Sequence, residues 1–205
     1  LSTFSMPKVV FLENVENLVS HDKGQTFKTI INTLENELNY HVIGVKKDKN
    51  GELVYDKKSF IRNTKNFGLP QNRPRVYIVA FSREYYGKHL EMLPKETPTE
   101  GRKEIFHSVL DILQPKVSEK YFLSSGLLKT LENHKTRQKN NGNGFGYRIV
   151  NDTTADRPLA HTILATGGSG KERNLIYDPV NGKSIIGKDV PPKKTPINDK
   201  CIRTI

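Results

Sequence analysis

The residue best placed for chemistry is Glu13, which follows the apolar run at residues 9–12 and precedes Asn14. That run is rich in β-branched residues and predicts a short buried strand that stops at the acid. In open α/β sheets, ligands bind beyond the carboxyl ends of the strands. Glu13 is therefore a candidate site residue. The alternative is a strand-end acid that only meets solvent or caps a turn, and spacing alone favours that alternative.

Two arginines, Arg73 and Arg75, form the second candidate group. They stand in a loop with Pro70 and Pro74, whose rings fix φ and reduce the conformational freedom of the chain. The apolar run at residues 76–81 predicts a strand directly after them. Arginines that alternate along a strand share one side of it and can offer forked donors to a phosphate or a carbonyl. The alternative is an exposed basic loop.

Two glycine-rich segments, at residues 140–148 and 166–171, form the third group. The second follows the apolar run at residues 162–165, which predicts a short strand. Neither segment has the spacing of a Walker A or dinucleotide motif, and a tight hairpin is the usual explanation of one such loop. Two of them in a basic region favour close approach to a nucleic acid. The side chains placed to make that contact are Asn143, Phe145, Tyr147 and Arg148.

Composition supports a polyanionic partner. The 205 residues include 33 basic and 22 acidic side chains, a formal net charge of +11, which favours nucleic acid over a membrane surface. A merely soluble basic protein is the alternative. The single cysteine excludes an internal disulfide framework and fits a reducing compartment. The six histidines show no metal-ligand spacing, so we expect no metal site, and no apolar run is long enough to span a membrane.

The elements that position the first two groups are expected from periodicity. Apolar residues from Phe27 to Leu38 recur at helical spacing, with Lys28, Asn32, Glu35 and Asn36 on the expected solvent face. Residues 40–45 predict a strand, and Asn50-Gly51 between short apolar runs predicts a β-hairpin within the insertion at residues 46–58. Residues 85–102, with two prolines and alternating charges, predict a linker.

The second half of the chain contains further predicted elements. Residues 104–113 predict a short amphipathic helix, and Ser124-Ser125 predicts the N-cap of a second helix that runs to about residue 139. Asn181-Gly182 predicts another hairpin, and residues 200–205 predict a strand.

The motifs together resemble the bacterial cytosine-5 DNA methyltransferase family. Phe-Leu-Glu-Asn-Val at residues 11–15 is similar to the Glu-Asn-Val motif of that family. Phe-Gly-Leu-Pro-Gln-Asn-Arg-Pro-Arg at residues 67–75 is similar to its Gln-x-Arg-x-Arg motif, and Thr-Ile-Leu-Ala at residues 162–165 to a short element of its target-recognition domain. The resemblance implies an α/β fold: part of a Rossmann-like methyltransferase sheet at residues 1–87, followed by a small mixed α+β target-recognition domain at residues 88–205.

The resemblance also implies roles in catalysis. A thiolate attacks ring carbon 6 of a flipped-out cytosine, and a carboxyl group that hydrogen-bonds ring nitrogen 3 and the exocyclic amine stabilises the resulting species. Glu13 matches that carboxyl group. Asn14 matches a structural residue at the site. Arg73 and Arg75 match residues near the flipped base and its phosphate, with Arg75 the better candidate for the base carbonyl. Gln71, counted among the DNA-binding residues, is expected to hold the loop by backbone hydrogen bonds.

In the recognition domain the resemblance implies contacts with double-stranded DNA. Thr162 is expected to contact a backbone phosphate, and Gly167 and Gly168 to allow close approach to the duplex. Asn143, Phe145, Tyr147 and Arg148 are candidates for the first recognition loop, and Arg173 is either a base reader or a scaffold residue. The implied setting is a restriction-modification system in the bacterial cytoplasm, associated with the nucleoid.

The resemblance implies S-adenosylmethionine as the methyl donor, but the cofactor motifs and the Pro-Cys nucleophile motif of the family do not occur in this sequence. We therefore expect the central part of such an enzyme, inactive alone, with a second polypeptide as one source of the missing motifs. A non-catalytic DNA-recognition module and a tRNA methyltransferase are the alternatives. The sequence indicates neither the target site, the oligomeric state nor a role for residues 46–58.

Overall fold

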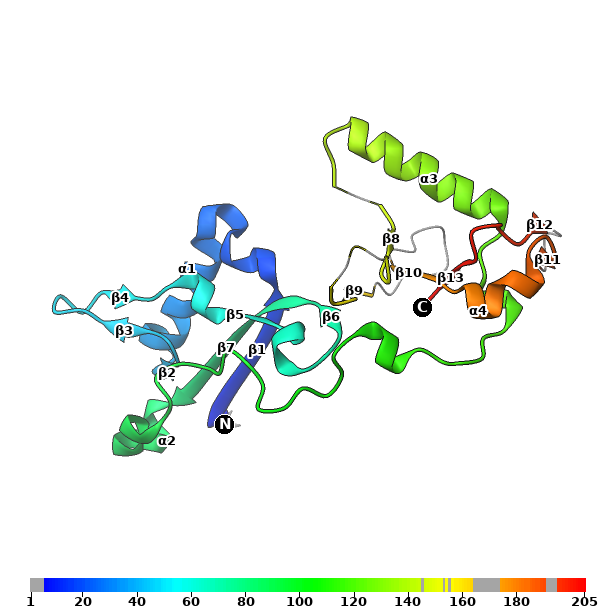
Figure 1. Ribbon diagram of the computed structural model, residues 1–205. Coiled ribbons are helices and arrows are strands. Elements are labelled where there is room, and N and C mark those ends of the chain that lie inside the picture. The colour runs from blue at the N-terminus through cyan, green and yellow to red at the C-terminus, as the bar shows by residue number, and fades with distance from the viewer. Residues whose placement is uncertain (1–5, 145, 153, 155, 164–173, 191–194) are drawn as a thin grey trace, which may run out of the picture. The chain divides into compact units, whose positions relative to one another are not determined.

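The computed structural model describes residues 6–144, 146–152, 154, 156–163, 174–190 and 195–205, and it has a mixed α/β fold (Figure 1). Internal contacts divide the chain into two units. Unit 1 comprises residues 1–67 and 74–102, and unit 2 comprises residues 68–73 and 103–205. The division concerns contacts alone, so the catalytic and recognition roles expected of residues 1–87 and 88–205 stay predictions.

Unit 1 is built on a four-stranded sheet around the long strand β7 (Pro74–Ser82). Strand β1 (Val9–Val15) pairs with one edge of β7, and β2 (Tyr40–Val42) and β5 (Ile61–Asn63) share the other. All of these pairings are antiparallel. The expected Rossmann-like arrangement stays a prediction. A separate two-stranded ribbon, β3 (Lys46–Lys47) with β4 (Leu53–Val54), confirms the hairpin expected at Asn50-Gly51.

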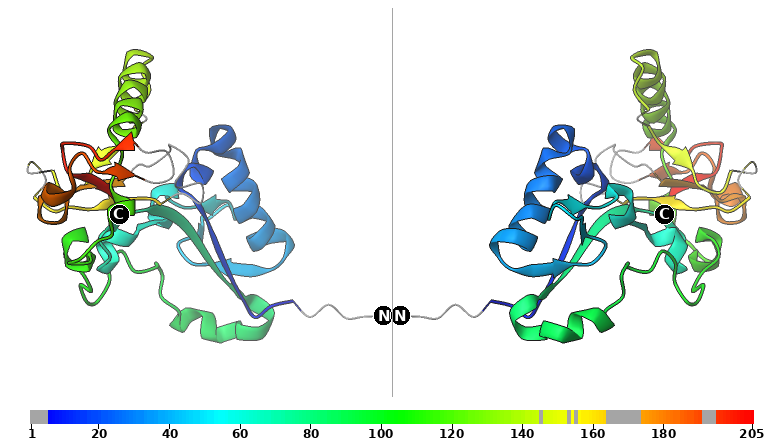
Figure 2. Two further views of the ribbon diagram at one scale, coloured as in Figure 1. Left: turned by 90° about the vertical axis from the view of Figure 1, so that its right-hand side faces the viewer. Right: turned by 90° about the vertical axis from the view of Figure 1, so that its left-hand side faces the viewer.

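Helix α1 (Gln25–Asn32) covers one face of this sheet (Figure 2). Its apolar side chains Phe27 and Ile31 are fully buried against Val76, Ile78 and Ala80 of β7, which confirms the predicted amphipathic helix. The helix continues as a wider turn over Thr33–Glu37.

The prediction that Glu35 faces solvent is wrong. Glu35 is buried because its carboxylate accepts hydrogen bonds from the Val42 backbone N–H at 2.7 Å and from Arg83 Nη2 at 2.5 Å. Leu38, expected in the core, is instead 42% exposed.

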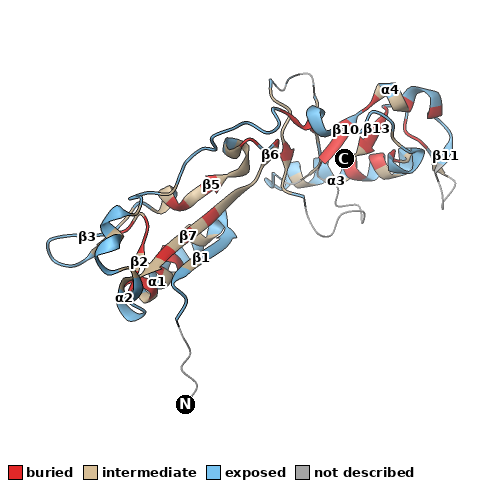
Figure 3. Ribbon diagram, turned by 90° about the horizontal axis from the view of Figure 1, so that it is seen from below, coloured by how far each residue is buried: buried red, intermediate tan, exposed pale blue. Residues whose placement is uncertain are grey.

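The prediction of a buried strand that stops at Glu13 is also wrong. Strand β1 runs on through Glu13 to Val15, and most of its residues are exposed (Figure 3). Apolar residues sit there because one face of β1 meets the α1 core through Val10, while Phe11 and Val15 lie on the other face. Within the described residues β1 pairs on one edge only.

Residues 83–102 belong to unit 1, and the prediction of a linker at residues 85–102 is wrong. Helix α2 (Arg83–Tyr86) and a 3-10 segment at Gly87–Met92 follow β7 directly. Further along, the buried Arg62 donates to the carbonyls of Thr97 and Pro98. The Arg62 guanidinium thus holds the segment around Thr97 and Pro98 through backbone carbonyls of that segment. Further short helical turns of unit 1 are Glu16–Val19, His21–Gly24, Lys57–Phe60 and Thr64–Phe67.

Unit 2 combines helix α3 (Ser125–Asn140) with small sheets. The Ser124 Oγ accepts from the Leu127 N–H at 3.2 Å, which confirms the predicted N-cap. Leu128 and Leu131 pack from α3 onto Leu175 in the core. The strands are β6 (Gln71–Asn72), β8 (Arg148–Ile149), β9 (Ala160–His161), β10 (Asn174–Tyr177), β11 (Asp189–Val190), β12 (Thr195–Pro196) and β13 (Ile202–Thr204).

These strands form three small sheets in unit 2. Strand β10 lies between β13, which is antiparallel to it, and β8, which is parallel. Strands β6 and β9 pair in parallel, and β11 and β12 pair antiparallel. Strand β13 confirms the strand expected near the end of the chain. Short helical segments are α4 (Pro179–Gly182) and the turns Val109–Ile112, Glu119–Tyr121 and Lys183–Ile185.

Three predictions in unit 2 are wrong. Residues 104–113 form only one 3-10 turn, because Ser108 caps it at its start and Ile105 and Leu110 remain exposed. The strand expected at residues 162–165 does not include Thr162 and Ile163, because the pairing with Gln71 puts the strand earlier, at β9; residues 164 and 165 lie outside the described residues. Asn181-Gly182 forms the end of helix α4 instead of a hairpin, since the Asp178 carboxylate caps that helix.

No helix in the described part of the chain is long and apolar enough to cross a membrane.

Candidate active site and DNA-binding surface

The site in unit 1 is set by the register between β1 and β7. Glu13 stands opposite Tyr77, and Val15 stands opposite Arg75. Directly opposed residues of an antiparallel pair project to the same face, and so do residues two apart on one strand. Glu13 and Arg75 are therefore diagonal neighbours on the face opposite to the α1 core. The strand register thus brings Glu13 and Arg75, which are far apart in sequence, into contact.

Glu13 and Arg75 form an ion pair, with Arg75 Nε 2.9 Å from Glu13 Oε1. The Arg75 side chain is 13% exposed and also donates from Nη1 to the Pro74 carbonyl at 2.7 Å. The Glu13 side chain is 44% exposed. Within the described residues no hydrogen bond or ion pair engages its second oxygen, Oε2. The geometry thus leaves an oriented carboxylate with one acceptor oxygen open to a ligand.

The neighbours of Glu13 divide between the two faces of the sheet. Asn14 projects to the opposite face from Glu13, and its Oδ1 accepts from the Val15 N–H at 2.8 Å. On the Glu13 face, Phe11 and Tyr77 have ring centroids 5.7 Å apart. These two rings line an apolar hollow of about 320 Å³ together with Val79. Glu13 is thus the one carboxylate on this face of β1, beside aromatic rings.

Arg73 and Gln71 belong to unit 2, whereas Arg75 belongs to unit 1. Gln71 lies in β6, and its Nε2 donates to the His161 carbonyl at 3.4 Å. Arg73 is half-buried immediately after that strand.

The described residues of the first recognition loop follow α3. Asn143 donates from Nδ2 to Gln138 Oε1 at 3.0 Å, on the last turns of the helix. Tyr147 packs against the α3 core, and Arg148 begins β8. Thr162 is half-buried just after β9. Four predicted DNA-binding residues lie outside the described residues: Phe145, Gly167, Gly168 and Arg173.

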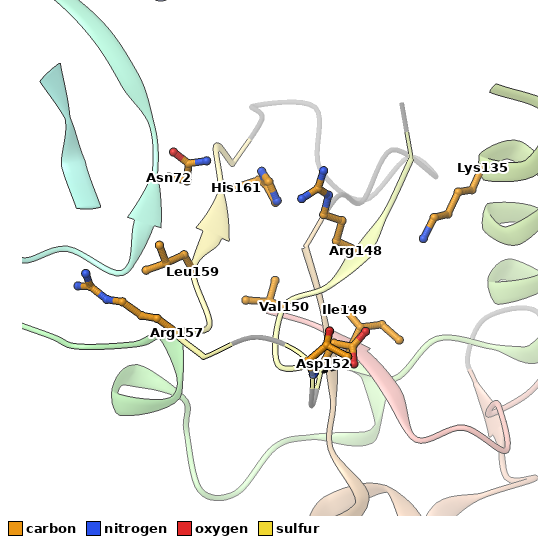
Figure 4. A pocket seen from close by; sticks show the side chains of 10 residues that line it. Asn72, Lys135, Arg148, Ile149, Val150, Asp152, Arg157, Leu159 and His161 are labelled. Atoms are coloured by element: carbon orange, nitrogen blue, oxygen red, sulfur yellow. Dashed lines mark hydrogen bonds between the residues drawn. The ribbon is translucent and has the colours of Figure 1, made fainter. Parts of the chain in front are cut away.

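A hollow of about 470 Å³ lies in unit 2 between β8, β9 and the end of α3 (Figure 4). Arg148 and His161 point toward one another over it, and Lys135 faces them from α3. The sequence analysis included Arg148 but missed the polar residues around it. The only signal for Lys135 was its place in a basic run. The polar side chains that line the hollow beside Arg148 are Asn72, Lys135, Asp152, Thr154, Arg157 and His161.

Burial changes the acidity of two groups in unit 2. Burial first, and then the nearby Glu132 carboxylate, raises the pKa of the Tyr147 hydroxyl, so the ring stays neutral at physiological pH. Burial likewise raises the pKa of the Cys201 thiol, which is a buried free cysteine. Neutral, buried thiols are poor nucleophiles. In the described residues no cluster of His, Cys, Asp or Glu is suited to hold a metal ion.

Comparison with known proteins decides the family. The model of the C-5 cytosine-specific DNA methylase family matches residues 3–205. The chain belongs to this family. Several curated relatives are named as type II methyltransferases.

Three relatives illustrate the match. The methylase chain is 40% identical over 173 residues to the type II methyltransferase M.HpaII of Haemophilus parainfluenzae, covering 84% of the chain and 41% of the relative. It is 39% identical over 159 residues to M1.ScrFI of Lactococcus lactis subsp. cremoris, covering 78% and 35%. It is 35% identical over 147 residues to a DNA-cytosine methyltransferase of Escherichia coli K12, covering 70% and 28%. The chain thus spans at most about two fifths of the length of these relatives.

Proposed function

We propose that this methylase chain supplies the base-binding carboxylate and the target-recognition part of a DNA cytosine-5 methyltransferase of a restriction-modification system. The observation that carries the proposal is the Glu13–Arg75 pair. Arg75 holds one carboxylate oxygen at 2.9 Å, and the other oxygen has no partner in the described residues. The match of the chain to a cytosine-specific methylase family supports the identity of the base.

The chemistry explains why an oriented carboxyl group is needed. Cytosine is a poor nucleophile at carbon 5 until a thiolate adds to carbon 6, which moves electron density onto the ring. The base must leave the helix stack to be reached. In the proposed step a protonated Glu13 carboxyl group donates its proton to ring nitrogen 3 as negative charge develops there, and it accepts a hydrogen bond from the exocyclic amine. These two contacts stabilise the adduct and select cytosine. An ion pair that fixes one oxygen leaves less rotamer freedom to lose on binding.

Arg75 then has two tasks in the proposed site. Its Nε and Nη1 are held by Glu13 and by the Pro74 carbonyl, so it orients the carboxylate. We propose that its remaining amine, Nη2, donates to the carbonyl of the base. We assign Arg73 to the neighbourhood of the flipped nucleotide and its phosphate, Asn14 to support of β1, and Gln71 to the loop through its contact with the His161 carbonyl.

We propose that the described residues supply neither the nucleophile nor a complete binding site for the methyl donor. Cys201 follows Lys200 and has a raised pKa in a buried site, so it does not suit attack on cytosine. Enzymes of this family take the methyl group from S-adenosylmethionine. Among the described residues, no glycine-rich segment directly follows a strand of the β1–β7–β2 sheet, so we propose that most of the binding site for this donor is supplied from outside residues 1–205. We propose that residues 1–205 alone do not transfer methyl groups.

Unit 1 is proposed to contribute late strands of a Rossmann-like catalytic domain. Unit 2 is proposed to be the target-recognition domain that contacts duplex DNA. The net charge of +11 supports this role, since Lys and Arg neutralise phosphates. The predicted contacts are Asn143, Phe145, Tyr147, Arg148, Thr162, Gly167, Gly168 and Arg173. Because the proposed substrate is DNA, we propose that the enzyme acts in the bacterial cytoplasm, at the nucleoid. A second polypeptide is one source of the missing motifs.

The proposal is tested by product analysis. The chain is incubated with tritiated S-adenosylmethionine and cytosine-containing duplex DNA, alone and with a polypeptide that carries the remaining segments of a relative. We expect 5-methylcytosine only in the mixture, and transfer to duplex DNA in preference to tRNA. Transfer to tRNA alone would identify a tRNA enzyme. DNA binding without any product in the mixture would identify a non-catalytic recognition module.

A further inference from the structure

The contact between Lys135 and Tyr147 joins helix α3 to the loop that precedes β8. The Lys135 ammonium lies 4.7 Å from the centroid of the Tyr147 ring. The ring also packs against the core of Leu128 and Leu131, so it is held on two sides. Between them, a Cβ at Gly146 would lie 2.9 Å from Lys135 Cγ, so only glycine lets the loop approach the helix this closely. A cation over an aromatic face is an attractive contact, more so when partly desolvated.

Arg148 follows directly, and among the described residues its side chain has no hydrogen-bond or ion-pair partner. Its backbone is fixed in β8, where it stands opposite Asn174 of β10. Its guanidinium is exposed and makes no hydrogen bond or ion pair with any described residue. Arg157, on the same hollow, is by contrast bound to Glu104 at 2.7 Å and to the His107 carbonyl. Arg148 therefore combines a backbone paired in a sheet with a fork of donors that no described residue engages.

The geometry points to a division of labour: the Lys135–Tyr147 contact positions Arg148, and Arg148 reads a guanine in duplex DNA. This inference rests on the proposed function of unit 2. An arginine fork donates in pairs to O6 and N7 of guanine, the commonest specific contact in the major groove. A target of a cytosine-specific methylase contains a C·G pair by definition, so a guanine is always present.

Positioning matters because base reading is less tolerant of movement than phosphate binding. A specific contact needs a side chain held within about half an ångström by packing and supporting contacts. A phosphate contact supplies affinity without reading sequence. Arg148 is positioned by its strand pairing and by the Lys135–Tyr147 contact at the residue before it. These supports suit it to read a base. Lys135 and Tyr147 are thus positioning residues, and Arg148 is the specificity-determining residue.

The test is selection from a pool of duplex oligonucleotides with a randomised centre, bound by the 205-residue chain. We expect the wild type to enrich a motif that contains guanine. Arg148→Lys should lose the preference for guanine at one position by at least tenfold. Lys135→Gln and Tyr147→Leu should lose the same preference, while Tyr147→Phe, which keeps the ring, should retain it. Lys129→Gln, on the same helix but outside the hollow, is the matched control and should leave the motif unchanged.

Each contrary outcome has a distinct meaning. An unchanged motif for Arg148→Lys would overturn guanine reading, as would a uniform loss of affinity for Arg148→Ala with a salt dependence lower by about one phosphate contact. If Arg148→Lys loses the preference but Lys135→Gln and Tyr147→Leu keep it, the positioning role is wrong. Circular dichroism of Lys135→Gln, a surface change, separates loss of folding from loss of positioning. A wild-type chain that binds no duplex at all would overturn the proposed function of unit 2 itself.

Discussion

Unit 1 contains two glutamate–arginine pairs that differ in how many carboxylate oxygens are hydrogen-bonded by described residues. Glu35 is 1% exposed at its side chain, and both of its oxygens are engaged, one by the Val42 N–H and one by Arg83. The Glu13 side chain is 44% exposed, and in the part of the chain that the structure describes Arg75 holds one of its oxygens and no residue holds the other. The same two residue types thus make a structural tie in one place and an open acceptor in the other. The availability of the second oxygen is what marks a site.

The largest expected effect is on the structural pair. Glu35→Ala leaves the Val42 N–H without its acceptor and the Arg83 guanidinium without its counterion. Removing one partner of a buried pair costs several kcal/mol, and since Arg83 is partly exposed we expect a loss of about 3 kcal/mol in unfolding free energy. Urea denaturation measures this. Glu37→Ala, on the exposed side of the same turn, is the control and should change stability by less than about 0.5 kcal/mol.

The open pair should respond in the opposite way. Glu13→Gln keeps the shape of the side chain but removes its charge, so we expect methyl transfer in the complemented enzyme to fall about a hundredfold, or about 2.7 kcal/mol. Unfolding free energy should change by no more than about 1 kcal/mol, because the ion pair is partly exposed. Glu16→Gln is the matched control. A rate within threefold of the wild type would remove Glu13 from the catalytic site.

A smaller effect is expected when the orienting group changes. Arg75→Lys keeps the positive charge but cannot hold the Glu13 carboxylate and the Pro74 carbonyl together through a planar fork. We expect methyl transfer to fall about tenfold, or about 1.4 kcal/mol, with little loss of stability. Single-turnover rates test this. If Arg75→Lys matches the wild type, charge alone suffices and orientation of Glu13 is unimportant.

The smallest effect concerns pH near the structural pair. Burial first, and then the Arg83 charge, lowers the pKa of His41, against an opposing effect of Glu35. The unfolded chain therefore binds a proton at higher pH than the folded chain. Stability from this group is complete above the unfolded pKa of about 6.5 and falls as the pH drops below it. The free energy of unfolding should differ less between pH 7.5 and pH 5.5 in the His41→Gln variant than in the wild type. Equal pH dependence would contradict the shift.

Local patterns were sufficient to predict several elements. The spacing of Phe27 and Ile31 predicted α1, Asn50-Gly51 predicted the β3–β4 hairpin, and Ser124 predicted the start of α3. Each of these depends on residues a few positions apart. Glu13 and Arg75 were selected as site residues by motif, although the sequence did not reveal that they form an ion pair.

The remaining features depend on contacts between distant segments. Burial of Glu35 requires Arg83, 48 residues later, so helical periodicity placed it wrongly on the solvent face. The register of β9 is set by Gln71, far earlier in the chain. The exposure of β1 likewise depends on which segments cover the sheet, whereas its apolar run alone predicted a buried strand.

The central claim is that the open oxygen of Glu13 binds the exocyclic amine of cytosine. It is tested most directly by a cycle that combines Glu13→Ala with a duplex whose target base is 2-pyrimidinone, which lacks that amine. Single-turnover methyl transfer by the complemented enzyme is measured for the four combinations. The account predicts that Glu13→Ala costs at least about fivefold more on cytosine than on 2-pyrimidinone, one hydrogen bond of about 1 kcal/mol. An equal cost on both bases would contradict it.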